Sequence, residues 1–221
     1  MCARRRKLRL ARKGINMNGK ESIARVVMFT SRAKDNGDIP NFRKRGRTFL
    51  SNEPIDNLIP QFKEFVGEGR PNEMCRLYVS INPRDVRKTM KKLCVHLIES
   101  EETLSTLTSL PQKMVSIAMK SECAAAKSWL FDFDSRDDKL VDEFVQDMMD
   151  YEGFDSVRMY RTPNGYGVIA PNGFDTRYLM DKWSYCCDLK RDAMRFVMIG
   201  LKDKEGNVCV SPQSGIVEIK R

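Results

Sequence analysis

The chain has few of the residues that build zinc and nucleophile sites. It carries a single histidine, His96, and none of its seven cysteines falls in a Cys-x-x-Cys pair. A structural zinc site needs four such ligands at characteristic spacings, so we expect none here. The odd number of cysteines indicates free thiols of a reducing compartment. Neither a complete P-loop motif nor Gly-x-Gly-x-x-Gly is present, which argues against a P-loop or dinucleotide site.

Long apolar runs are also absent. No segment approaches the roughly 20 consecutive apolar residues that cross a bilayer. The basic start of the chain is not followed by the apolar region of a secretory signal. We therefore expect a cytoplasmic protein that does not enter a membrane. The length of 221 residues suits one domain with an extension.

The net charge of +9 is concentrated at one end. Residues 1–13 hold seven basic residues and no acidic one, so the remainder of the chain carries only +2. A tail of this kind, residues 1–16, is typically disordered and binds polyanions in a salt-dependent way. Met17 is an alternative start that would remove it. A second basic cluster at 43–47 is followed by Phe49, which suits either a solvated loop or a nucleic-acid contact.

The most informative stretch is an apolar strand at 129–133 that contains two aspartates. Side chains alternate along a strand, so Asp132 and Asp134 share one face. Two adjacent carboxylates repel, and a bound divalent cation relieves the repulsion. Oxygen ligands of this kind suit Mg²⁺ or Mn²⁺. The alternative is that Asp134, Ser135 or Asp137 caps the following helix.

The hydrophobic periodicity predicts an α+β fold. Strands are expected at 76–81, 129–134 and 193–201, and helices at 54–66, 83–97, 111–127 and 139–149. Asn164-Gly165 predicts a hairpin between strands at 156–162 and 166–170. This order indicates a mixed or antiparallel sheet with helices on one face, not a doubly wound fold. We expect residues 17–75 to be an N-terminal extension packed on a core domain of residues 76–221.

The order of these motifs resembles the catalytic core of archaeo-eukaryotic primases and primase-polymerases. Phe131-Asp132-Phe133-Asp134 matches the first family motif, a strand ending in Asp-x-Asp. Thr162-Pro163-Asn164-Gly165-Tyr166-Gly167 matches the Ser/Thr-x-x-Gly-x-His turn. Asp188 and Asp192 compete for the third motif, an aspartate beside a strand, and Arg195 follows either one. The resemblance implies an RRM-like, primase-type palm.

The same resemblance implies a metal-dependent nucleotidyltransferase that acts on nucleoside triphosphates and a nucleic-acid template. Its metal ligands would be Asp132 and Asp134, with Asp188 or Asp192 as a further catalytic carboxylate. Phosphate contacts would come from a set of residues around the turn and the later strands: Arg161, Thr162, Asn164, Gly165, Tyr166, Arg177 and Arg195. A role beside a replication machinery, in a phage or mobile element, would suit so small a chain.

One departure from the family leaves two functions open. The histidine that helps to hold the nucleotide's phosphates in the family is replaced by Gly167. Either other groups supply that contact, or the fold is retained as a non-catalytic module that binds nucleic acid or protein. A phosphatase of the Asp-x-Asp class ranks last, because about 130 residues precede the motif and the later hairpin does not fit that class.

Overall fold

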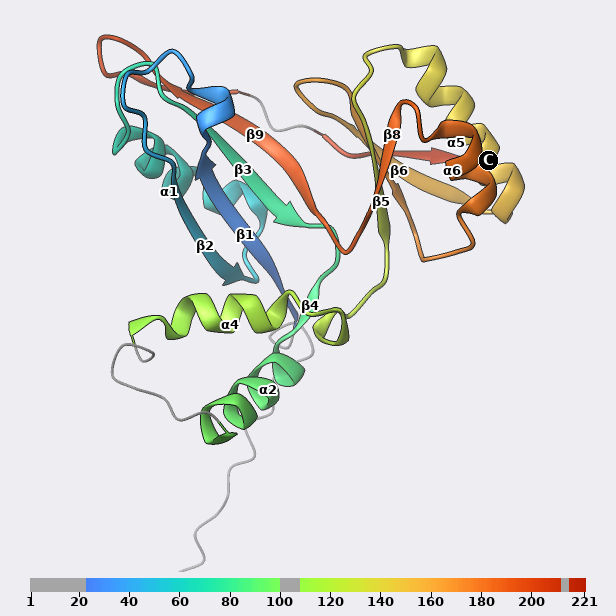
Figure 1. Cartoon of the computed structure of the whole chain (residues 1–221), viewed down its shortest axis with the longest axis horizontal. Coiled ribbons are helices and arrows are strands. Elements are labelled where there is room, and N and C mark those ends of the chain that lie inside the picture. The colour runs from blue at the N-terminus through green and yellow to red at the C-terminus, as the bar shows by residue number, and fades with distance from the viewer. Residues whose placement is uncertain (1–22, 100–107, 212–214) are drawn as a thin grey trace, which may run out of the picture.

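The computed structural model describes residues 23–99, 108–211 and 215–221. Its strands form two antiparallel sheets that lie side by side (Figure 1). The α+β class expected from the sequence is confirmed. The sequence predicts one sheet, but the structure has two. Each sheet combines strands from distant segments of the chain, which local patterns do not reveal. In the described ranges, no helix is long and apolar enough to cross a membrane. The basic tail lies outside the described residues.

The first sheet has the strand order β10-β9-β3-β1-β2, with β4 paired to the start of β1. The strands are β1 (Ile23–Ser31), β2 (Arg45–Ser51), β3 (Met74–Ser80), β4 (Arg84–Asp85), β9 (Met194–Lys202) and β10 (Val208–Val210). Because β1 pairs with both β2 and β3, the segment before residue 76 supplies part of the sheet itself. It is therefore not an extension added to a separate core.

Helix α1 (Ile55–Gly67) covers one face of this sheet. Phe62 and Phe65 on the helix pack against Phe29 of β1, with ring centroids 5.3 and 5.8 Å apart. Alternation along β1 places Val27 and Phe29 in this core, while Met28 and Thr30 face the other way. The short helix η1 (Ala33–Asp35) follows β1 directly. The face opposite α1 is thus free to line a site.

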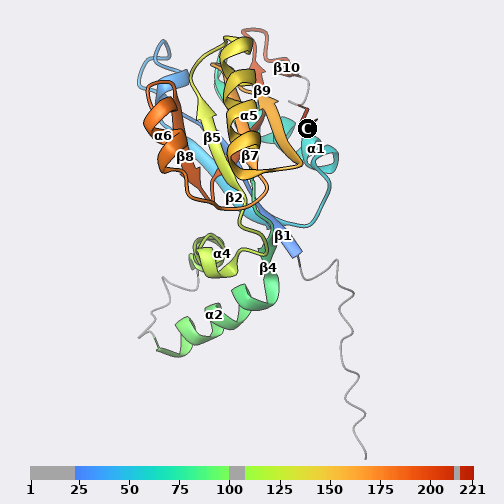
Figure 2. The same ribbon diagram turned by 90° about the vertical axis from the view of Figure 1, so that its right-hand side faces the viewer.

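The second sheet has the order β11-β6-β7-β5-β8, and all its pairings are antiparallel. Its strands are β5 (Trp129–Phe133), β6 (Ser156–Arg161), β7 (Tyr166–Ala170), β8 (Cys187–Arg191) and β11 (Val217–Lys220). Helices α5 (Asp138–Glu152) and α6 (Arg177–Trp183) cover the face turned away from the first sheet (Figure 2). Asp137 caps α5 by accepting hydrogen bonds from two backbone amides, which confirms one of the three capping candidates.

A small apolar cluster joins the two sheets. Ile81 and Phe196 from the first sheet's side pack with Leu130, Tyr160 and Ile169 of the second. This apolar cluster therefore fixes how the inner faces of the sheets meet.

Two helices, α2 (Val86–Glu99) and α4 (Leu110–Ala118), lie beyond one end of the sheets, as Figure 1 shows. The helix expected at 111–127 ends at residue 118, and the one-turn helix η2 (Ser121–Cys123) follows.

Candidate functional site

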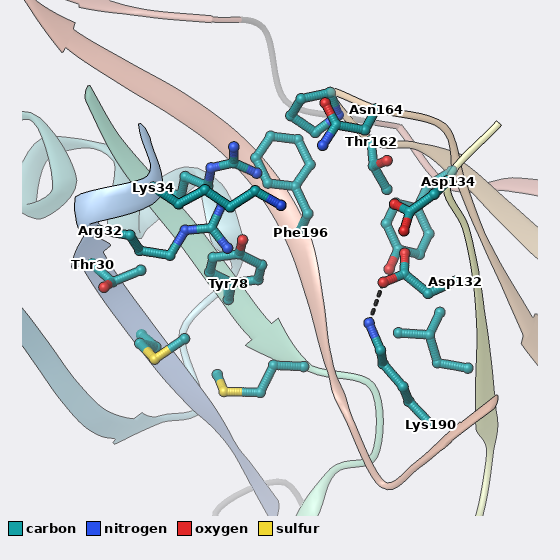
Figure 3. Close-up of a pocket in the computed structure, with 16 residues that line it drawn as sticks. Thr30, Arg32, Lys34, Tyr78, Asp132, Asp134, Thr162, Asn164, Lys190 and Phe196 are labelled. Carbon is teal, nitrogen blue, oxygen red and sulfur yellow. Dashed lines mark hydrogen bonds and ion pairs between the residues drawn. The ribbon is translucent and has the colours of Figure 1, made fainter. Parts of the chain in front are cut away.

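The inner faces of the two sheets enclose a pocket of about 470 Å³. Figure 3 shows Arg32 and Lys34 on one side of it, with Asp132 and Asp134 on the other. The basic residues lie at the end of β1 and in η1, whereas Asp132 lies in β5 of the second sheet and Asp134 directly follows that strand. The pocket therefore has walls of opposite charge that come from distant parts of the chain.

The acidic wall is built by the alternation of β5. Phe131 and Phe133 are fully buried against Phe144 of α5, with ring centroids 5.2 and 4.7 Å away. Asp132 and Asp134 consequently face the pocket, as the spacing of two predicts. Burial of the aromatic face fixes the register of the strand, since a slip of one residue would exchange the faces. The orientation of the carboxylates is thus secured by the core behind them.

Cross-strand pairing adds a third carboxylate. Asp132 lies directly opposite Asp188 of β8 and opposite Gly167 of β7, and directly opposed residues share a face of the sheet. Asp188 also lines a smaller hollow of about 220 Å³ together with Asp132 and Asp134. Strand β8 is absent from the sequence-based prediction, and its pairing is what brings Asp188 to the site.

Asp192, the other candidate, is committed elsewhere. Its two carboxylate oxygens accept hydrogen bonds from the guanidinium of Arg84, both at 2.7 Å, and Asn82 donates a third bond at 3.0 Å. Arg84 is fully buried, so this ion pair satisfies a charge that would otherwise be costly to bury. Asp192 lines neither the pocket nor the smaller hollow that Asp188 shares with Asp132 and Asp134. The geometry therefore favours Asp188 over Asp192 as the third carboxylate.

Asp132 already has a cationic partner. The Lys190 ammonium group forms an ion pair with it (Figure 3). Burial alone would lower the pKa of Lys190, but the hydrogen bond to Asp132 and the attraction of Asp132, Asp188 and Asp134 together outweigh burial, and the pKa is raised. Among the described side chains, no three His, Cys, Asp or Glu residues are arranged to hold a metal ion. One or two carboxylates with substrate phosphates nevertheless suffice for Mg²⁺. The donor set suits such an ion once Lys190 releases Asp132.

The basic wall is held in place by one aspartate. Asp35 of η1 accepts hydrogen bonds from Arg32 at 2.8 Å and from Arg76 of β3 at 2.6 Å. Burial by itself would raise the pKa of Asp35, but the two arginines outweigh it and the pKa is lowered. Arg76 is only 9% exposed. Its Nε atom is buried and has no hydrogen-bond partner within the described part of the chain. Such a donor is suited to an anionic ligand.

Two aromatic rings lie along this wall. Tyr78 of β3 and Phe196 of β9 line the pocket, with centroids 6.0 Å apart in an edge-to-face arrangement. Neither ring was predicted from the sequence to line a site, nor were Arg32, Lys34 and Arg76. These residues carry no motif, and only the pairing of β1, β3 and β9 brings them together. Regular alternation marks β3 as a strand but does not show which sheet face meets a second sheet.

The hairpin contributes part of what was expected. Thr162 and Asn164 line the pocket, and the Gly165 amide donates a hydrogen bond to the Thr162 hydroxyl at 3.0 Å. A Cβ at Gly165 would lie 2.0 Å from the Phe133 carbonyl oxygen, so only glycine lets the turn approach the end of β5. Tyr166 is buried in the core between the second sheet and helices α5 and α6, where its hydroxyl donates a hydrogen bond to Asp138. It is therefore not brought to the pocket.

The three arginines assigned to phosphate binding also lie elsewhere. Arg161 is exposed and pairs with Asp138, and Arg177 pairs with Asp175 at the surface. Arg195 occupies the opposite face of the first sheet from Phe196, its neighbour in β9. None of the three lines the pocket. Their proximity to the motif in sequence did not predict their positions, because alternation along β6 and β9 turns Arg161 and Arg195 away from the pocket, and Arg177 lies on helix α6.

Tyr160 explains why position 167 is a glycine. Gly167 lies opposite Tyr160 of β6 in the register of the sheet. A Cβ at Gly167 would be only 2.3 Å from Cζ of the Tyr160 ring. The phenol lines the pocket and is almost fully buried. A tyrosine from the neighbouring strand therefore fills the space that a side chain at position 167 would need.

Comparisons of the chain with family models, curated proteins and solved structures yield no match.

Proposed function

We propose that this protein is a metal-dependent nucleotidyltransferase of primase-polymerase type, which acts on nucleoside triphosphates and a nucleic-acid template. The observation that carries the proposal is the pocket between the sheets, with carboxylates on one wall and cations with aromatic rings on the other. A nucleoside triphosphate presents those complementary parts: a polyanion that binds metal, and a base that stacks. The resemblance of the Asp-x-Asp strand and the hairpin to the primase core supports the same assignment.

The side chains divide the task of holding the nucleotide. Arg32, Lys34 and the Nε of Arg76, which has no hydrogen-bond partner among the described residues, are suited to phosphate oxygens. Tyr78 and Phe196 offer faces or edges for the base. Asp132 and Asp134 would hold Mg²⁺ or Mn²⁺, which supplies charge neutralisation at the transferring phosphoryl group. Lys190 holds Asp132 in place through their ion pair until the ligand arrives.

A separate basic groove supports a nucleic-acid partner. Helices α2 and α4 border a hollow of about 770 Å³. Five lysines line it, against the two acidic residues Glu99 and Glu122: Lys88, Lys91, Lys92, Lys113 and Lys120. Lys92 pairs with Glu122, which leaves an excess of positive charge along the groove. Phosphate backbones bind such surfaces with a strong dependence on salt.

The decisive experiment titrates Mn²⁺ into the full chain by calorimetry, with and without a nucleoside triphosphate. We expect Asp134→Asn to abolish manganese binding. We expect Lys34→Gln to weaken the nucleotide while leaving the metal unaffected, since the two residues lie on opposite walls. Asp155→Asn, an exposed residue outside the pocket, is the matched control. Template extension is then measured with the same four proteins. If the wild type does not bind manganese even with nucleotide present, the protein is not a metal-dependent nucleotidyltransferase.

The ion pair between Lys190 and Asp132 favours a second candidate function, a non-catalytic nucleic-acid-binding module on the same fold. A lysine that permanently neutralises Asp132 removes the need for a cation there. Lys190→Met separates the two candidates because it deletes the charge and keeps most of the apolar stem. In the enzyme, the substitution tightens manganese binding by removing a competitor. In the binding module, neither protein binds manganese, and wild type still binds oligonucleotide.

A further inference from the structure

Three arginines converge at a second pocket, of about 260 Å³, where the two sheets meet. Arg25 comes from β1, Arg158 from β6 and Arg195 from β9. This pocket shares no lining residue with the site described above. Adjacent residues of one strand line different pockets. Tyr78 lines the first pocket and Val79 the second, and likewise Phe196 lines the first and Arg195 the second. The arginine pocket therefore lies on the opposite face of the first sheet from the carboxylate pair.

The three guanidinium groups are poorly compensated by the protein. Arg195 is only 7% exposed, and its described polar contact is a 3.4 Å bond to the Phe196 carbonyl oxygen. Arg25 donates to the carbonyl oxygens of Ser80 and Ile81 at 2.8 and 2.9 Å. Within residues 23–99, 108–211 and 215–221, no ion pair joins any of the three arginines to an acidic residue. Arg25 and Arg158 are partly exposed, but Arg195 is buried, and a buried charge is normally paired, so Arg195 lacks the expected anion.

Glu53 is the one acidic side chain among the described residues that line the pocket. Its Oε2 atom accepts a hydrogen bond from the Asn57 amide at 2.7 Å, and it forms no described ion pair with the cluster. Burial lowers the pKa of Arg195 to about 10, and repulsion from Arg25 and Arg158 adds to the effect, although the nearby Tyr160 opposes it. Arginine ordinarily titrates above 12. The pocket thus holds a strong local excess of positive charge.

We infer that this pocket binds a phosphate group. Guanidinium groups match phosphate oxygens by paired hydrogen bonds. A phosphate has enough oxygens to bond to arginines from three strands at once, whereas a single carboxylate does not. The volume is below the roughly 300–1,000 Å³ of pockets that enclose whole drug-sized ligands. It suits one phosphate group, either free inorganic phosphate or a single phosphate of a nucleic-acid backbone. The inference does not depend on the proposed nucleotidyltransferase.

The test is a calorimetric titration of inorganic phosphate into the full chain at constant ionic strength, with chloride as the replaced anion. We expect saturable binding by the wild type. Arg158→Gln should weaken it at least about tenfold, since each charged hydrogen bond contributes strongly to anion affinity. Arg195→Gln should do the same. Arg47→Gln, which removes an exposed arginine paired with Glu68, is the matched control and should bind like the wild type.

Thermal unfolding without phosphate supplies a second measurement. Arg158→Gln should leave the melting temperature equal to or above that of the wild type, because it relieves repulsion among like charges. A role in structure alone predicts a fall. Displacement of phosphate by an unphosphorylated oligonucleotide would identify the backbone as the source of the anion, and no displacement would identify free phosphate. The inference is overturned if the wild type binds no phosphate, or if Arg158→Gln and Arg47→Gln bind it equally.

Discussion

Substitution of Gly167 by alanine should destabilise the protein through Tyr160. The new Cβ would lie 2.3 Å from Cζ and 2.5 Å from the hydroxyl oxygen of the ring. The ring cannot move to solvent without leaving a cluster that contains Leu130, Ile169 and Phe196. Overpacking costs about 1–3 kcal/mol, and replacing a strand glycine returns part of that cost. We therefore expect a loss of about 1–2 kcal/mol in the free energy of unfolding.

Urea denaturation followed by circular dichroism measures this loss. Gly37→Ala is the matched control, because its Cβ would meet only the Ala33 carbonyl oxygen, 3.9 Å away, and its effect should stay within about 0.5 kcal/mol. A double-mutant cycle with Tyr160→Leu identifies the cause. If the ring is responsible, Gly167→Ala costs less in the Tyr160→Leu background than in the wild type, with a coupling of about 0.5–3 kcal/mol. Strict additivity, or a neutral Gly167→Ala, would refute the reasoning.

Three further predictions concern the supports of the two sheets. Asp137→Ala removes the cap of α5 and should cost about 1 kcal/mol in urea denaturation, whereas Asp137→Ser should retain most of the stability. Asp192→Asn leaves the buried Arg84 without its counter-charge; we expect a loss approaching about 3–5 kcal/mol, and a neutral result in thermal unfolding would contradict the role of the pair. The pKa of Asp35 is lowered in the folded state, so its stabilising contribution is present above its unfolded pKa and disappears as pH falls through the folded value. An acid titration of stability should therefore show a shallower fall below about pH 4 in Asp35→Asn than in the wild type.

Local patterns account for the parts of the fold that could be predicted. The period of two in β5 identifies both the buried phenylalanines and the shared face of Asp132 and Asp134. Asn164-Gly165 marks the hairpin, whose strands pair from Arg161 and Tyr166 outward. Each of these features depends on residues only a few positions apart, so local sequence patterns are sufficient to predict it.

The remainder depends on pairings between distant segments. Met74 of β3 lies opposite Leu201 of β9, and Val27 of β1 lies opposite Val79. No local signal specifies such partners. Strand β8 was missed because Cys187–Arg191 is short and largely polar, and a strand at the edge of a sheet needs no buried alternation. Without these pairings, the basic wall and the division into two sheets were not predicted, and the choice between Asp188 and Asp192 stayed open.

Tyr160 changes the meaning of the missing histidine. In the primase family that the motifs resemble, the histidine helps to hold the nucleotide's phosphates, and here its position is a glycine covered by a phenol from the next strand. Burial raises the pKa of Tyr160, and the nearby Asp132 raises it further. The phenol therefore stays protonated and neutral. It offers the pocket a hydroxyl but no positive charge, so in the proposed nucleotidyltransferase the counter-charge of a triphosphate would come from the basic wall across the pocket, from Arg32, Lys34 and Arg76. On this reasoning the nucleotide's affinity depends on the first sheet more than on the hairpin that carries the motif.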